Sequence, residues 1–136
     1  MITDRPHYLN LGCGSVFSTS PQWINMDIAP ADRRAVHQYQ LILGIPFADA
    51  SFMAVYQSHI LEHFPREQVP AFLRECFRVL RPGGILRVAV PDLENILRAY
   101  LAALDDARAG EAGAEDRLSW MQLELLDQLT RQYSGG

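Results

Sequence analysis

Lysine is absent from this 136-residue chain, so all twelve cationic side chains are arginines, and they are spread along the sequence without a basic run. Sixteen acidic residues leave a formal net charge of −4. Proteins that bind nucleic acid or anionic membranes concentrate positive charge on one face or segment. The charge pattern therefore predicts no nucleic-acid partner and no membrane partner.

Cysteine and long apolar runs are scarce as well. The two cysteines, Cys13 and Cys76, stand far apart, and such a pair supports neither a disulfide framework nor a zinc site. No stretch approaches the roughly 20 apolar residues that span a bilayer. The early polar residues, beginning at Asp4, are unlike a secretory signal. These absences predict a cytoplasmic protein with two free thiols.

Short apolar segments alternate with amphipathic ones, which is the pattern of an α/β domain. The last apolar segment is interrupted only by Arg87, as expected of a strand that is buried on both faces. The predicted strands are residues 7–11, 23–28, a weaker one within 36–41, 53–57 and 85–90.

Three segments predict helices. In the first, residues 65–81, apolar side chains recur at helical spacing from Val69 to Leu80, and the helix is expected to stop before Pro82. The second follows Asp92, whose carboxylate can accept hydrogen bonds from the first backbone amides. The chain is thus expected to be one domain with a core over residues 7–109, a glycine-containing connector over 110–114 and a C-terminal helix over 115–133.

Gly12 and Gly14 directly follow the first predicted strand. A strand that runs into Gly-x-Gly forms a tight turn where the backbone can approach a ligand, because no Cβ intervenes. Dinucleotide sites need a third glycine that keeps the next helix close to the strand, but Phe17 stands there. Only eight residues separate Gly14 from Trp23, which leaves room for one helical turn at most. A pyrophosphate site is therefore disfavoured.

Asp27 lies at the carboxyl end of the second predicted strand, 13 residues beyond Gly14. A carboxylate at this point can accept two hydrogen bonds from the vicinal hydroxyls of a ribose. The alternative is a solvated Asp that caps the end of a strand. The glycine turn nearby favours the ribose interpretation.

Five segments, taken in order, resemble the successive motifs of class I S-adenosylmethionine-dependent methyltransferases, especially a bacterial subgroup of the methyltransferase type 11 kind. They are LNLGCG at 9–14, WINMD at 23–27, IPFAD at 45–49, SHILEH at 58–63 and LRPGG at 80–84. The match covers residues 7–92, and its specificity lies in the ordered spacing. The resemblance implies a Rossmann-like, mostly parallel sheet and S-adenosylmethionine as the cofactor.

The resemblance also implies roles at the methionine end of the cofactor. Gly12, Cys13 and Gly14 are expected to line the methionine part, and the backbone around Ser58 and His59 is expected to close that end.

At the nucleoside end, the resemblance implies that Asp27 holds the ribose and that Ile28 packs on the adenine. The adenine edge would be met by Gln40 together with the Leu41 amide, at a position where the wider family often has Asp.

The segment from His59 to His63 also reads H-x-x-E-H, the zinc motif of inverzincin peptidases. That motif needs a helix and a further acidic ligand downstream, whereas here it follows a strand and is broken at Pro65. A divalent ion held by Glu62 and His63 is a second alternative, but His59 stands where related metal-binding methyltransferases carry Glu. We therefore predict no metal ligand in this segment and expect His63 to pack beneath the loop.

Methyl transfer is an in-line displacement at a carbon that a sulfonium already activates, so the protein supplies mainly proximity and alignment. For a hydroxyl acceptor, His59 is the candidate catalytic base, because an imidazole exchanges protons near neutral pH. The expected acceptor is a small molecule or a glycan, and the sequence also leaves a lipid-linked sugar or a protein open.

Two alternatives to a methyltransferase enzyme stay open: a cofactor-binding or assembly module without an acceptor site, and a nucleotide-sugar or NAD enzyme, which Phe17 disfavours.

The resemblance implies seven strands ordered 3-2-1-4-5-7-6, but only five are predicted here, so the C-terminal hairpin is expected to be missing. The fifth strand would then present an open apolar edge, which is a template for pairing. We therefore expect a homo-oligomer, formed through that edge or by exchange of the helix at 115–132.

Overall fold

The computed structural model describes the backbone of residues 6–130 and the side chains of residues 6–126. The chain divides into two compact units, one that ends at Val90 and one that begins at Pro91, and each is described by itself. No helix among these residues is long and apolar enough to cross a membrane.

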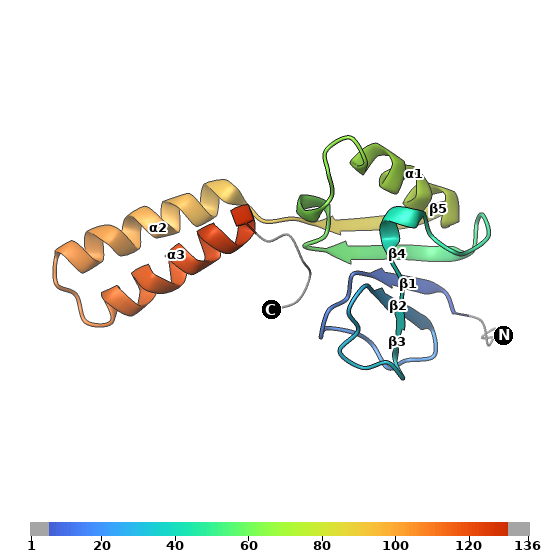
Figure 1. Ribbon diagram of the computed structural model, residues 1–136, viewed down its shortest axis with the longest axis horizontal. Coiled ribbons are helices and arrows are strands. Elements are labelled where there is room, and N and C mark those ends of the chain that lie inside the picture. Colours follow the sequence, from blue (N-terminus) through green and yellow to red (C-terminus); the bar gives the residue numbers. More distant parts are fainter. Residues whose placement is uncertain (1–5, 131–136) are drawn as a thin grey trace. The chain divides into compact units, whose positions relative to one another are not determined.

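A five-stranded parallel sheet forms the framework of the first unit (Figure 1). Its strands are β1 (Tyr8–Leu11), β2 (Trp23–Asp27), β3 (Val36–Gln38), β4 (Phe52–Ser58) and β5 (Leu80–Ala89), in the spatial order β3-β2-β1-β4-β5. The predicted Rossmann-like α/β sheet is confirmed, with the order that the resemblance implies for the first five strands. Since all neighbouring strands are parallel, their carboxyl ends lie along one edge.

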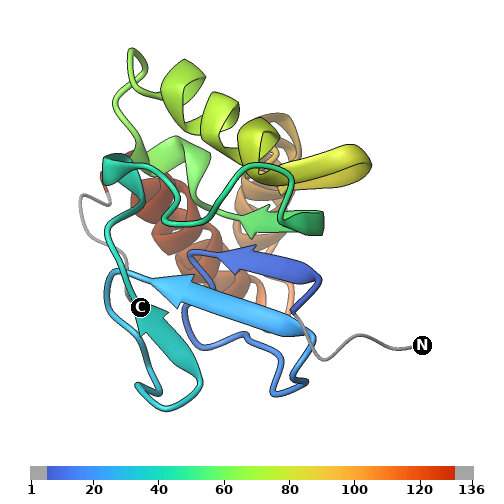
Figure 2. The ribbon, with the colours of Figure 1, turned by 90° about the vertical axis from the view of Figure 1, so that its right-hand side faces the viewer.

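One face of the sheet is covered by helix α1 (Val69–Val79), together with the 3-10 turn η1 (Leu41–Leu43) (Figures 1 and 2). Side chains that alternate along the strands bury themselves against α1, as a parallel sheet requires. The core consists of Leu9, Leu11, Met26, Leu41, Ile45, Phe52, Val55, Ile60, Phe72, Cys76 and Val79. Cys13 and Cys76 are both buried free thiols, as predicted.

The predicted end of α1 is wrong. Leu80 fits the helical stripe, but it is extended, with ψ 139°, and it pairs with Phe52 as the first residue of β5. The cause lies in the next residues: a residue before proline avoids helical angles, so Arg81-Pro82 ends the helix early. The register then shifts, so that Ile85 pairs with Ala54 and the Pro-Gly-Gly segment forms a bulge within β5.

The connection between β1 and β2 is a loop. The chain from Gly12 to Gln22 is irregular, in keeping with the short spacing there. Two buried asparagines hold it in place: Asn10 donates to the Val16 carbonyl (3.2 Å), and Asn25 donates to the Ser18 carbonyl (2.8 Å). These side-chain hydrogen bonds link the loop to β1 and β2.

The second unit is a helical hairpin of α2 (Leu93–Arg108) and α3 (Ala114–Thr130). Asp92 caps α2 as predicted, because its carboxylate accepts from the Asn95 backbone N–H at 3.1 Å. An ion pair between Arg117 and Asp106 (3.2 Å) joins the two helices near the turn. Residues 131–133 of the predicted C-terminal helix lie outside the described residues.

Candidate functional site

The glycine turn begins where β1 ends. Gly12 and Gly14 have φ values of +58° and +53°, in the left-handed region that side chains rarely adopt. A Cβ at Gly12 would lie 2.5 Å from the side chain of Ile60, whereas nothing lies within 4 Å of a Cβ at Gly14. The Cys13 N–H donates to the Met26 carbonyl at 3.2 Å. The turn therefore packs between the end of β2, to which it is hydrogen-bonded, and the segment after β4, which carries Ile60.

Asp27 lies directly against this turn. Its carboxylate accepts from the Gly14 N–H through Oδ2 and from the Ala29 N–H through Oδ1, both at 2.8 Å, and the residue is only 1% exposed. The sequence indicated an acceptor for a ligand; it did not indicate these two backbone donors. A carboxylate has about four acceptor positions, so about two stay unused.

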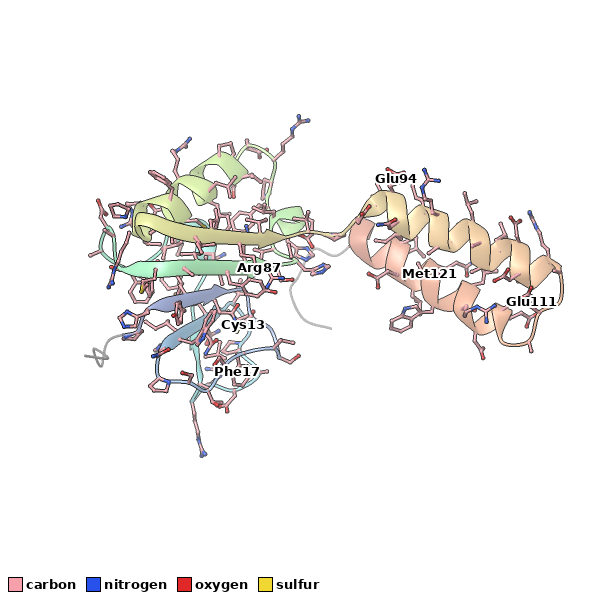
Figure 3. All side chains as sticks on the ribbon, turned by 180° about the vertical axis from the view of Figure 1, so that it is seen from behind. Cys13, Phe17, Arg87, Glu94, Glu111 and Met121 are labelled. Atoms are coloured by element: carbon pink, nitrogen blue, oxygen red, sulfur yellow. The ribbon has the colours of Figure 1, made fainter. Side chains whose placement is uncertain are left out.

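Cys13 lies between the two glycines, on the loop that also carries Phe17 (Figure 3). Burial, and secondarily the nearby charge of Asp27, raises the pKa of the Cys13 thiol to about 11. A thiol with such a pKa stays protonated at neutral pH and is a poor nucleophile. Cys13 therefore offers the site a backbone amide and a small apolar side chain.

The segments after β2 and β3 are tied to each other. Gln38 Nε2 donates to the Ile28 carbonyl (3.1 Å), and the Tyr39 N–H donates to the Asp27 carbonyl (2.8 Å). The side chain of Ile28 is 48% exposed, so an apolar surface is open at the end of β2.

The predicted adenine-edge residues lie just beyond β3, which ends at Gln38. Gln40 is exposed, while the Leu41 side chain packs into the core and leaves only its backbone for a ligand. Sequence reasoning missed Gln38 and Tyr39, because bonds from a strand end to a neighbouring loop carry no sequence pattern.

The segment after β4 reaches the glycine turn from the other side. Ser58 is the last residue of β4, and His59 has φ +54°, with its N–H donating to the Ala89 carbonyl at 3.0 Å. Ile60 follows and fills the space beside Gly12. The structure thus brings the predicted residues at Gly12–Gly14, Asp27 and Ser58–His59 to one edge of the sheet.

The H-x-x-E-H segment is not an α-helix. Its last three residues form the 3-10 turn η2 (Leu61–His63), and His59 Nδ1 lies 3.3 Å from Glu62 Oε1. Within the part of the chain that the structure describes, no three His, Cys, Asp or Glu side chains come close enough together to hold a metal ion.

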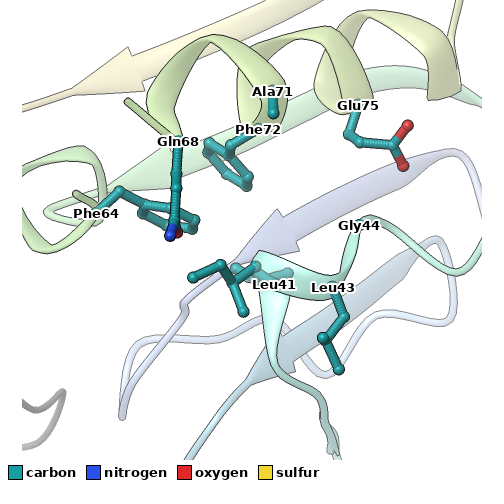
Figure 4. A pocket seen from close by; sticks show the side chains of 9 residues that line it. Leu41, Leu43, Gly44, Phe64, Gln68, Ala71, Phe72 and Glu75 are labelled. Atoms are coloured by element: carbon teal, nitrogen blue, oxygen red, sulfur yellow. The ribbon is translucent and has the colours of Figure 1, made fainter. Parts of the chain in front are cut away.

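A cavity of about 480 Å³ lies between η1 and the start of α1 (Figure 4). Leu41, Leu43, Phe64 and Phe72 supply its apolar wall, and Gln68 and Glu75 supply its polar groups. Sequence reasoning missed it, because the space depends on how two elements distant in sequence pack.

The family model and the two relatives described here that resemble this chain are all methyltransferases. A family model described as "Methyltransferase domain" matches residues 9–88. The chain is 26% identical over 132 residues to the ubiquinone biosynthesis O-methyltransferase of Parvibaculum lavamentivorans, covering 84% of this chain and 48% of that protein. It is 36% identical over 86 residues to the 27-O-demethylrifamycin SV methyltransferase of Amycolatopsis mediterranei, covering 62% and 30%. The chain thus spans about half or less of these relatives' length.

Solved structures share the fold. The PH0226 protein from Pyrococcus horikoshii OT3 superimposes with a TM-score of 0.55 at 21% identity, over 79% of this chain and 55% of that chain. A DhpI-SAM-HEP complex superimposes with a TM-score of 0.51 at 25% identity, over 71% and 52%.

Proposed function

Because this chain belongs to the methyltransferase-domain family, we propose that its first unit binds S-adenosylmethionine and transfers the methyl group to a hydroxyl of a small molecule or glycan. One observation carries the proposal: the buried Asp27 carboxylate accepts from the Gly14 N–H at 2.8 Å, so the turn after β1 meets the end of β2 at one edge of the sheet. The names of two relatives, a ubiquinone biosynthesis O-methyltransferase and a 27-O-demethylrifamycin SV methyltransferase, support an oxygen acceptor.

The turn is proposed to receive the methionine part of the cofactor. The open space around Gly14 lets a ligand approach the backbone of Gly12, Cys13 and Gly14. The backbone of Ser58 and His59 would close this end, since Ile60 already seats that segment against Gly12.

The nucleoside is proposed to extend from Asp27 past Ile28. The unused lone pairs of the Asp27 carboxylate would accept from the ribose hydroxyls. Because this carboxylate is nearly inaccessible, ribose binding requires the Gly14 turn to shift or the hydroxyls to replace one backbone donor. Adenine would then lie on the exposed Ile28 side chain, with Gln40 and the Leu41 amide at its edge.

When bound, the cofactor would supply a methyl group activated by a sulfonium, whose carbon an acceptor oxygen can attack in line while the thioether leaves. The chain contributes alignment through the turn and a proton acceptor through His59. That side chain is 54% exposed at the carboxyl edge of the sheet, where an acceptor can reach it.

Calorimetry with S-adenosylhomocysteine, the demethylated product, tests the proposal, with NAD as the control ligand. Gly14→Ala adds a Cβ that meets no protein atom, so it should weaken binding by about tenfold through backbone strain and contact with the ligand. Gly110→Ala is the matched control, since Gly110 also has positive φ (+75°) and open surroundings but lies in the second unit. Equal affinity for NAD, or equal effects of the two variants, would contradict the proposed site.

A further inference from the structure

Glu62 is an acidic residue whose carboxylate lacks hydrogen-bond donors. Its side chain is 15% exposed, yet both oxygens are inaccessible to solvent, and neither accepts a hydrogen bond from any group among residues 6–130. Burying a carboxylate in this way is costly unless a donor or a cation compensates it. Such a group calls for an explanation.

The nearest compensating group is the imidazole of His59. Its Nδ1 lies 3.3 Å from Glu62 Oε1, within hydrogen-bond reach once an Nδ1–H points at that oxygen. The side chain of His59 is 54% exposed, so the imidazole is accessible from solvent. An imidazole that donates through Nδ1 keeps its Nε2 lone pair free to accept a proton.

The backbone holds this pair together. His59 has φ +54°, an unfavourable angle for a side-chain-bearing residue. It is retained because the His59 N–H bonds the Ala89 carbonyl at 3.0 Å and because Ile60 packs against Gly12. The 3-10 turn that follows then brings Glu62 Oε1 to 3.3 Å from His59 Nδ1. An over-determined strained residue at a sheet edge is a feature of functional sites.

We propose that Glu62 is a positioning residue for His59, an inference that rests on the proposed function. Glu62 accepts the Nδ1–H of His59 and so turns Nε2 toward the acceptor. As the acceptor oxygen bonds to the methyl carbon and the carbon–sulfur bond breaks, the hydroxyl proton passes to Nε2. Water then removes that proton, and the imidazole is neutral again.

Nitrogen-15 NMR of the imidazoles, at a pH where they are neutral, tests the pairing. We expect the Nδ1–H tautomer of His59 to exceed the Nε2–H tautomer about tenfold, from the strength of a hydrogen bond to a charged acceptor. Glu62→Ala should reverse this preference. Glu62→Gln keeps an acceptor oxygen and should preserve it. Glu67→Ala, at an exposed glutamate nearby, should change nothing.

Two results would overturn the inference: an Nε2–H tautomer in the wild type, or a tautomer ratio unaltered in Glu62→Ala. The same samples, titrated with S-adenosylhomocysteine, separate this inference from the proposed function. If the product does not bind, the proposed function fails, but the tautomer ratio still tests the pairing of Glu62 with His59. If it binds, the Nε2 signal of His59 should shift and that of His37, exposed on β3, should not; an unmoved His59 signal would contradict its place at the reacting atoms.

Discussion

Replacing Asp27 by alanine tests whether this carboxylate holds the glycine turn after β1 in place. The change removes the acceptor of two backbone N–H groups, those of Gly14 and Ala29, at 2.8 Å each. A hydrogen bond to a charged group contributes about 1.5–3 kcal/mol. Part of that loss is offset, because the mutant no longer buries a charge. We therefore expect the free energy of unfolding to fall by about 2–4 kcal/mol.

Urea denaturation, followed by circular dichroism, measures the change. Asp32→Ala is the matched control, because Asp32 also accepts a backbone N–H two residues on, that of Arg34 at 2.8 Å, but in an exposed setting. It should cost less than about 1 kcal/mol. If Asp27→Ala also stays within about 1 kcal/mol of the wild type, the carboxylate does not hold the turn.

Three further predictions concern a paired carboxylate, a buried amide and an exposed strand edge. Glu75 accepts from Arg78 and from the Ile45 N–H, and these bonds, Arg78 first, lower its pKa to about 2. The ionised Glu75 carboxylate therefore stabilises the fold above about pH 5, and this stabilisation is lost as the pH falls toward 2. The stability difference between wild type and Glu75→Gln should shrink over that range, and a constant difference would refute this. Gln57 is fully buried, and its amide has no hydrogen-bond partner among the described residues, so Gln57→Leu should raise the free energy of unfolding by about 1–3 kcal/mol in urea denaturation, and a loss of stability would count against it. Within the described sheet, β5 pairs only with β4, and Ile85 is 66% exposed on it, so we expect light scattering to give a mass above that of a monomer; a monomer at every concentration would exclude this association.

The sheet could be predicted closely from the sequence, because its strands are short apolar runs bounded by turn residues. β1 and β2 differ from their predicted limits by one residue at one end, and β4 differs by one residue at each end. The boundary between α1 and β5 could not be predicted so closely from the sequence. Leu80 suits a helix face and a strand equally, and the pairing with Phe52 decides between them.

The candidate site could be predicted in part. Glycine permits the positive φ found at Gly12 and Gly14, and their spacing from Asp27 points to one sheet edge. The hydrogen bonds that Asp27 accepts from two backbone amides could not be predicted from the sequence, because the path of the turn that carries those donors is set by tertiary packing. The same holds for the buried Glu62 carboxylate, whose solvent exclusion depends on contacts that no local pattern encodes.

The central claim is that the cofactor binds at the carboxyl ends of β1, β2 and β4. An amide-resolved NMR titration with S-adenosylhomocysteine tests it most directly. We expect saturable shifts at Gly12, Gly14, Ala29 and His59, the amides that line the turn and the two segments facing it. Shifts confined to the cavity beside Phe64 and Ala71, or none at all at saturating ligand, would contradict it.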